Sequence, residues 1–299
     1  MVTNSKIIQE VENERKVTTL LMLPLILGLL LMSGVGVSAD DSSEEALNSD
    51  MEIQKILSKY GIANMEDTKS LSIAERTQIS QELKQYADAE MAEAEDELMP
   101  VRKTPTVMGY TTVTLGNDAY FYTADAGLED QGSSYYPVGI WEGDYNTSTR
   151  KAESTVVLGP IGWGSAWAVG GVGKLFYVTG EGSQSANIRF TGDYLGLLSA
   201  VGGGSASVLL ELMLYDYDTE SKTRTTVLNR SVSAVGWDQY DSNFNQTLPV
   251  VLQAGHSYCA YIQVQGSCGI VVEAEAGSDF GDEDYDAGHT RYSSIVIDF

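Results

Sequence analysis

The chain has 299 residues and a formal net charge of −24, from 42 acidic and 18 basic side chains. Residues 1–39 are balanced, whereas residues 40–99 hold 16 acids against five bases and residues 100–299 hold 23 against ten. Because no segment is basic, the composition argues against a surface that binds nucleic acid or anionic lipid. We expect the acidity to serve a solvated surface.

The N-terminus has the pattern of an export signal. Residues 17–37 are mostly apolar, Arg15 and Lys16 precede them, and Val37 and Ala39 occupy the −3 and −1 positions of a cleavage site. This pattern predicts a secretory signal peptide over residues 1–39. The alternative is an uncleaved anchor, which would be the chain's one link to a membrane. Both interpretations predict that the rest of the chain is extracellular or at the cell surface.

Residues 40–99 form an acidic segment whose signals are helical. A first helix is expected from Ser49 or Asp50 to a stop at Gly61. A second begins with a capping box formed by Ser72 and Glu75. Its apolar residues are Ile79, Leu83, Tyr86 and Ala94.

This apolar stripe is too narrow to build an independent core. We expect the segment to pack on the main domain, to pair with another chain, or to serve as an acidic stalk. A removable pro-segment is a further alternative. Pro100 ends the segment, and residues 100–105 are expected to link it to the next domain.

Residues 106–299 are predicted to form a mainly β domain. Short β-branched and aromatic runs alternate with Gly, Asp, Asn and Ser, which is typical of a sandwich or barrel. In "SYCAYIQV", residues 257–264, alternate side chains predict one face in the core and one in water. Gly-rich residues 163–175 and 199–207 suit bends, bulges or close contacts between sheets. We expect a jelly-roll-like antiparallel β-sandwich.

The stretch "LPVVLQAGHSYCAYIQV", residues 248–264, reads as a strand, a tight turn at Ala254–Gly255 and an inner strand. In this it resembles secreted jelly-roll modules as an architecture. The resemblance points to no single family, so it implies no site residues.

Cys259 and Cys268 lie in a stretch that reads as a hairpin turning near Gly266–Ser267. Straight pairing would place Cys259 opposite Ala274, so a disulfide forms only if the loop folds back along the strand. An oxidising exterior would permit it. The sequence leaves open whether the two cysteines are bonded or free, and neither sits in a C-x-x-C pair that would indicate zinc.

The catalytic signals are weak. No G-x-S-x-G nucleophile elbow occurs. Glu273 and Glu275 are expected on one face of a strand, about 7 Å apart, a spacing that could serve glycoside hydrolysis. The alternative is two acids on a solvent-facing strand. We expect His256 and His289 to form hydrogen bonds near strand starts, and we lean against an enzyme.

An acidic stretch near the C-terminus is a candidate calcium site. Asp279, Asp282, Asp284 and Asp286 offer the oxygen ligands that calcium prefers, although the EF-hand pattern is not met. The alternative is a solvated acidic turn before the last strand. A second pair of acids, Asp216 and Asp218, reads more simply as a hairpin end.

Aromatic residues and glycosylation motifs complete the candidates. Tyr135, Tyr136, Trp141 and Tyr145 would form a sugar-stacking platform if exposed, or would otherwise pack over one end of the sandwich. Three N-x-S/T motifs in expected surface loops make the chain a candidate glycoprotein. Their acceptors are Asn146, Asn229 and Asn245.

These features predict an exported, non-catalytic surface or envelope protein whose jelly-roll domain binds a glycan or a surface protein. Two alternatives remain open at this point. One is a secreted carbohydrate-active hydrolase using paired carboxylates, and the other is a subunit of a surface assembly with residues 40–99 as its arm.

Overall fold

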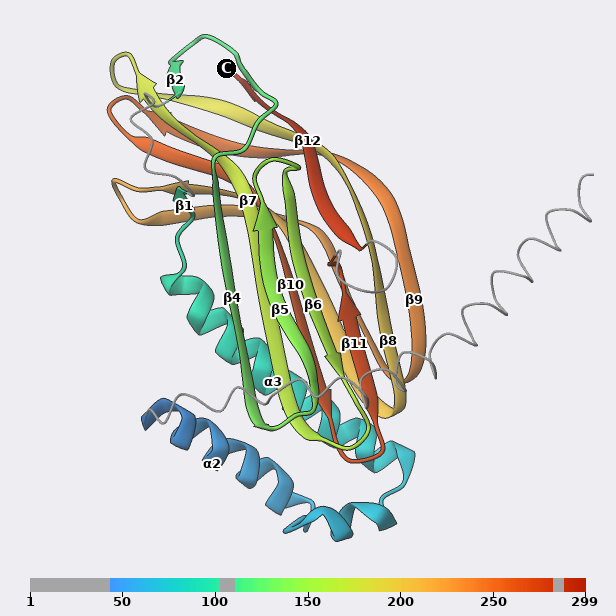
Figure 1. Ribbon diagram of the computed structural model, residues 1–299. Coiled ribbons are helices and arrows are strands. Elements are labelled where there is room, and N and C mark those ends of the chain that lie inside the picture. Colours follow the sequence, from blue (N-terminus) through green and yellow to red (C-terminus); the bar gives the residue numbers. More distant parts are fainter. Residues whose placement is uncertain (1–43, 103–110, 282–287) are drawn as a thin grey trace, which may run out of the picture. The chain divides into compact units, whose positions relative to one another are not determined.

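The computed structural model describes residues 44–102, 111–281 and 288–299, and residues 44–299 make one compact unit (Figure 1). The helical elements are α2 (Glu44–Lys59), the 3-10 helix η1 (Met65–Ser70) and α3 (Ile73–Glu97). The strands are β1 (Val101–Arg102), β2 (Thr111–Thr114), β3 (Ala119–Phe121), β4 (Ala126–Tyr136), β5 (Gly139–Asn146), β6 (Lys151–Leu158), β7 (Trp163–Thr179), β8 (Ser183–Asp216), β9 (Ser221–Gln253), β10 (Ser257–Ile270), β11 (Glu275–Asp279) and β12 (His289–Asp298). The predicted mainly β fold with a preceding helical segment is confirmed.

Hydrogen bonds join the described strands into one twelve-stranded network with the order β1-β4-β7-β10-β8-β11-β6-β12-β3. Strand β5 pairs with β6, and β9 pairs with β8. Every pairing is antiparallel except that of β2 with β7, which is parallel. We call β1, β4, β7, β10 and the adjoining half of β8 the first sheet. The second sheet comprises β3, β5, β6, β11, β12 and the other half of β8.

The two sheets lie face to face, because β5 and β6 contact β4, β7 and β10 without pairing to them. Glycine permits the closest approach. A Cβ at Gly170 would stand 2.1 Å from the Glu153 carbonyl oxygen, and one at Gly143 would stand 2.0 Å from the Val169 oxygen. The expected role of glycine in close sheet contacts is therefore confirmed in β7.

Strands β8 and β9 run through both sheets as one long hairpin (Figure 1). The sequence pattern predicts two shorter strands in place of each of them. The register instead shows pairing along the whole hairpin, with irregularities between Ala200 and Gly204 and between Leu210 and Glu211. Gly202 and Gly203 have φ values of 63° and 105°, which a side chain rarely adopts. This glycine bulge bends the hairpin from one sheet into the other.

The helical segment begins earlier than predicted, since α2 starts at Glu44 rather than near Ser49. The capping box is confirmed: Ser72 accepts from the Glu75 N–H, and Glu75 accepts from the Ser72 N–H. Helix α3 lies against β7, β8 and β10. Ile79 and Leu83 are fully buried and belong to the larger of the two hydrophobic clusters.

Two expectations about β10 were wrong. It continues without a turn from Ser257 to Ile270, pairing with β7 on one side and β8 on the other. Its second face is not wet, because Cys259, Tyr261 and Gln263 are buried as fully as the core face. The reason is that α3 covers this face of the first sheet, a long-range contact that alternation in one strand cannot reveal. Among the described residues, no helix is long and apolar enough to cross a membrane.

Candidate functional site

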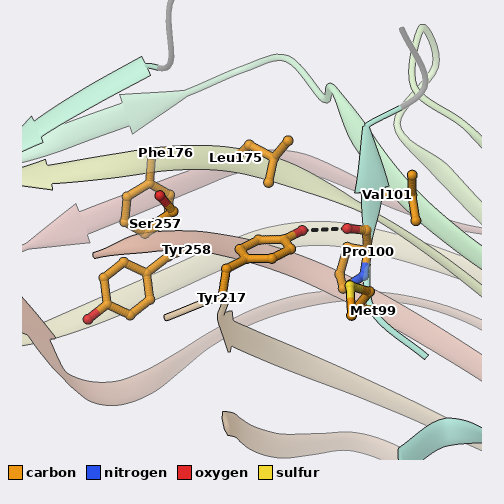
Figure 2. Close-up of a pocket in the computed structure, with 8 residues that line it drawn as sticks. All are labelled: Met99, Pro100, Val101, Leu175, Phe176, Tyr217, Ser257 and Tyr258. Carbon is orange, nitrogen blue, oxygen red and sulfur yellow. Dashed lines mark hydrogen bonds between the residues drawn. The ribbon is translucent and has the colours of Figure 1, made fainter. Parts of the chain in front are cut away.

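A pocket of about 350 Å³ lies beside the residues that link α3 to β1, at one end of the first sheet. Figure 2 shows the Tyr217 ring lying across it, with the Tyr217 hydroxyl donating a hydrogen bond to the Pro100 carbonyl. The walls are almost entirely apolar or aromatic. The lining residues are Met99, Pro100, Val101, Leu175, Phe176, Tyr217, Ser257 and Tyr258.

The aromatic wall is held in place from behind. Tyr258 is buried and stacks on Phe176, with ring centroids 5.6 Å apart, and its hydroxyl accepts from the Gln253 N–H. Tyr217 meets Tyr215 edge-on at 4.8 Å. Burial raises the pKa of Tyr217 far above its ordinary value, so its phenol stays protonated. The pocket is therefore preformed, with a neutral aromatic lining.

A network of charged groups fixes the turn beside the pocket. His256 Nδ1 lies 2.9 Å from Asp216 Oδ2, and the Ser257 N–H donates to Asp218 Oδ2 at 2.7 Å. The Asp218 N–H donates in turn to Asp216 Oδ1. These bonds tie the β8–β9 turn to the start of β10. His256 therefore makes a hydrogen bond directly before the start of β10, as the sequence predicts.

Burial acts to raise the pKa of Asp216, but hydrogen bonds from His256, the Asp218 N–H and Thr219 outweigh it. The pKa of this carboxyl therefore lies below its ordinary value of 3.8. Asp216 is ionised at neutral pH and can hold the neighbouring imidazole by a charge-assisted hydrogen bond.

The same three side chains could hold a metal ion. One ligand atom from each of Asp216, Asp218 and His256 lies within 4.8 Å of the others. Two carboxylates and an imidazole suit a divalent cation. Binding would require His256 to give up its bond to Asp216, so the hydrogen-bonded network and the ion compete for the same atoms. The sequence named both aspartates but could not place His256 beside them.

The predicted calcium site lies largely outside the described residues, which exclude Asp282, Asp284 and Asp286. Asp279 is described and ends β11. Its Oδ1 accepts hydrogen bonds from Thr155 at 3.0 Å and from the Gly281 N–H at 3.2 Å. Burial raises the pKa of Asp279, and these bonds only partly counter it. The calcium site stays a prediction.

The predicted pair of carboxylates does not share a strand. Glu273 lies in the turn between β10 and β11, at φ 69°, and its carboxylate stands 2.5 Å from Arg76 of α3. Glu275 is the first residue of β11. The expectation of one strand face bearing both acids was wrong, because Val272 and Glu273 form a turn where the sequence reads as unbroken strand.

The two cysteines are free and fully buried, so the disulfide considered from the sequence does not form. Both lie in the single strand β10, about 30 Å apart at roughly 3.3 Å per residue. Cys259 packs with Tyr261 under α3, whereas Cys268 belongs to the core between the sheets. They point to opposite faces, and a disulfide needs Cα atoms within about 7 Å.

The four predicted platform residues do not present one exposed surface. Tyr136 is 66% exposed and meets Tyr135 edge-on at 4.8 Å. Trp141 and Tyr145 are partly buried and pack on the central core. The Tyr145 ring occupies the space where a Cβ at Gly127 would lie, which places it between the sheets.

The predicted glycosylation sites lie on the surface, and His289 is partly buried in a hydrogen-bonded cluster. Asn146, Asn229 and Asn245 are exposed, although Asn229 and Asn245 lie within strand β9 rather than in loops. Glycosylation stays a prediction. His289 Nε2 lies 2.7 Å from Asp193 Oδ2, and Arg291 also binds this carboxylate. Burial acts to raise the pKa of Asp193, but both partners outweigh it and lower the pKa.

Sequence reasoning missed the pocket itself. Its walls come from the residues between α3 and β1, from β1 and β7, from the β8–β9 turn and from β10. The residues look like ordinary strand aromatics in the sequence. One local signal was present, since Tyr217 stands between two aspartates at the end of an apolar run.

Comparison with known proteins adds little. No protein-family profile matches the chain, and no curated protein matches it. One solved structure, an Arthrobacter globiformis T6 isomalto-dextranse complexed with panose, is 14% identical over 58% of this chain, with a TM-score of 0.14. The match spans only 23% of that chain. A likeness at this level carries no argument about fold or activity.

Proposed function

We propose that this chain is an exported surface protein whose β-sandwich binds a glycan or a partner protein and does not transform it. The observation that carries the proposal is the preformed pocket at the end of the first sheet. A volume of about 350 Å³ lies within the range that ligand pockets commonly have.

The lining of the pocket suits recognition. The Tyr217 ring offers an apolar face against which a sugar ring or an aromatic side chain packs. Ser257 adds a polar side chain to the lining that can orient a ligand. An apolar body with a few fixed polar groups is the usual composition of a binding site.

Export is supported by the N-terminal sequence. The apolar run at residues 17–37, the basic residues before it and the small residues after it make the pattern of a secretory signal. The acidic composition suits a surface held in water.

The arrangement of the acids supports binding over hydrolysis. Glu273 is engaged by Arg76, and Glu275 lies beyond a turn, so these two carboxylates are not placed across a shared bond. Glycoside hydrolysis needs two carboxyl groups flanking the scissile linkage. The hydrolase alternative therefore loses the Glu273–Glu275 pair.

The test compares two tyrosines. Tyr217→Ala removes the ring that crosses the pocket, whereas Tyr136→Ala removes an exposed ring of the predicted surface platform. We expect Tyr217→Ala to lower binding to an immobilised oligosaccharide and cell-surface protein array at least tenfold, and Tyr136→Ala to leave it unchanged.

Circular dichroism and the melting temperature establish that each variant is folded. Unchanged binding by folded Tyr217→Ala, with loss in Tyr136→Ala, would move the site to the surface aromatics. Release of reducing sugar from any array member would overturn the non-catalytic assignment.

A surface-assembly subunit is the second candidate, and strand β9 favours it. Within the described residues β9 pairs with β8 alone, so the other edge of a 33-residue strand presents backbone groups that can pair. Such an edge is a template for strand addition by another chain. Sedimentation velocity distinguishes this candidate, since a purely monomeric chain at high concentration contradicts it.

A further inference from the structure

The pocket is the open end of a longer face. Tyr217 and Leu175 line the pocket, while Tyr215, Cys259 and Tyr261 form a cluster on the first sheet with Ala87 and Met91 of α3. Residues 211, 213 and 215 are alternate positions of β8, so their side chains point to the same side of the sheet. Tyr217 follows directly after the strand, and its ring meets that of Tyr215. The face that begins in the pocket thus continues beneath the C-terminal part of α3.

The two ends of α3 are attached differently. Near its start, Ile79 and Leu83 join the larger hydrophobic cluster, and a Cβ at Gly269 would stand 2.3 Å from the Ser80 carbonyl oxygen. From Lys84 onward, many contacts to the sheet are polar. They are Lys84–Ser207 at 3.1 Å, Asp88–Ser267 at 2.5 Å, Glu90–Ser134 at 2.7 Å, Glu95–Gln265 at 3.0 Å and Glu95–Arg224 at 3.2 Å.

The covered face also holds polar atoms that α3 leaves unbonded. Among the described residues, the Tyr261 hydroxyl, the Ser165 hydroxyl and both amide atoms of Gln263 have no hydrogen-bond partner. All three residues are at most 1% exposed. Burying polar groups without partners is unfavourable and uncommon in native proteins.

Two buried carboxylates lie on the same covered face, close to each other and to Arg224. Glu95 and Glu211 are each about 5% exposed, and each stands within 4 Å of Arg224. Burial is the main cause that raises the pKa of Glu211; Arg224 counters it, and the charge of Glu95 raises it further. Moving α3 away would separate these two acids. It would also free the Arg224 and Gln265 side chains, which now donate to Glu95, to bind a ligand on the sheet.

The free groups indicate the chemistry of a replacement ligand. Gln263 offers a donor and an acceptor, and the hydroxyls of Tyr261 and Ser165 can each do both. Sugar hydroxyls likewise donate and accept, and the apolar face of a sugar ring packs on aromatic rings such as Trp167 and Tyr261. An oligosaccharide matches this mixture of groups more closely than an apolar ligand does.

We propose that residues 84–97 of α3 are a displaceable cover, and that the sheet face beneath them binds an oligosaccharide that extends from the pocket. The ligand class rests on the proposed function. The N-terminal half of α3 stays attached through Ile79 and Leu83, while residues 84–97, which bear Ala87 and Met91 besides the polar contacts, leave the sheet.

A reversible lock tests the proposal. Asp88→Cys with Ser267→Cys replaces two side chains that meet in a hydrogen bond between α3 and β10, so that an oxidised pair would tie the two elements together. Binding of maltohexaose, cellohexaose and chitohexaose is followed by tryptophan fluorescence, and hydrogen exchange of residues 84–97 is measured alongside. The same protein after reduction is the control for folding.

We expect the reduced protein to bind at least one hexasaccharide, with faster exchange in residues 84–97, and the oxidised protein to bind it at least tenfold more weakly. Equal binding in both forms overturns the cover and leaves the ligand in the pocket, so the proposed function survives. Exchange in residues 84–97 that sugar does not change also counts against the cover.

A second variant opens the cover instead. Glu95→Ala removes the acceptor for Gln265 and Arg224, and Glu97→Ala removes an exposed acid in the same turn. Because apparent affinity scales with the fraction of open molecules, we expect Glu95→Ala to bind the hexasaccharides about three- to tenfold more tightly. Glu97→Ala should match the parent. Absence of sugar binding in Glu95→Ala overturns the ligand class, and binding of an acidic peptide there would indicate a protein partner.

Discussion

At the scale of single residues, both histidines of the chain are held by a hydrogen bond to an aspartate carboxylate. His256 is paired with Asp216, and His289 with Asp193. In each case the aspartate has its pKa lowered below the ordinary value despite burial. The physical cause is the stabilisation of the charged carboxylate by several donors at once. These pairs hold strand ends in register beside the pocket and beside β12.

Replacing Asp216 with Asn tests this account. We expect Asp216→Asn to lower the free energy of unfolding by about 2 kcal/mol at neutral pH, since a charge-assisted hydrogen bond is lost. The folded-state pKa is depressed, so the contribution is present above the ordinary value of 3.8 and disappears as pH falls through the folded value. Urea denaturation from pH 7 down to about pH 2 measures the difference between variant and parent.

The control for this prediction is Asp298→Asn. Asp298 and Arg189 lie 3.5 Å apart with both side chains well exposed, so their ion pair contributes little, about 0–1 kcal/mol. If the difference in the free energy of unfolding between Asp216→Asn and the parent stays unchanged at pH 2, the aspartate acts through packing and not through its charge.

At the scale of elements, α3 converts an antiparallel sheet with one wet face into a sheet buried on both faces. Close approach depends on Gly203 and Gly269, where a Cβ would lie 2.6 Å from the Arg76 Cβ and 2.3 Å from the Ser80 oxygen. The backbone of α3 therefore lies directly on the sheet near its start. The close approach ends at Lys84, whose N would lie 2.6 Å from the Cβ at Gly269. Beyond Lys84 the contacts are made by side chains, apolar at Ala87 and Met91 and polar at Asp88 and Glu95.

Gly269→Ala is expected to loosen this attachment. The added methyl group must push α3 from β10, at a cost of about 1–3 kcal/mol in the free energy of unfolding. Gly159→Ala is the matched control, because its nearest neighbour would lie at 3.5 Å, an ordinary contact. Thermal denaturation followed by circular dichroism compares the two. Equal stability of both variants would show that α3 shifts without loss.

At the scale of the whole molecule, the net charge of −24 determines how salt changes the stability of the folded state. Like charges spread over one chain repel one another and oppose the compact state. Salt reduces the range of this repulsion from about 30 Å at 0.01 M to about 3 Å at 1 M.

We therefore expect the melting temperature to rise by several degrees between about 0.01 M and 1 M NaCl at pH 7. The rise should shrink near the isoelectric point of about 4.2, where net repulsion vanishes. Scanning calorimetry at both pH values is the measurement. A melting temperature that falls with salt at pH 7 would mean that attractive ion pairs outweigh the general repulsion.

Local patterns were sufficient for much of this fold. Three features depend only on neighbours in the sequence and were predicted from it. They are the capping box at Ser72 and Glu75, the turn at Ala254–Gly255 and the pattern of short β-strands after residue 106. Strand ends were less accurate. β10 passes through Gly266 without turning, because its partners β7 and β8 pair with it on both sides and supply the hydrogen bonds that a turn would have interrupted.

The sequence by itself determined the acidity, the mainly β architecture, the helical segment and the candidate export signal, since composition and short periodicities encode them. Only the tertiary structure decided that Cys259 and Cys268 point to opposite faces, that His256 meets Asp216, and that an aromatic pocket opens beside them. These features join residues far apart in the chain. Such contacts depend on how the sheets and α3 pack, and no spacing along one strand reports that.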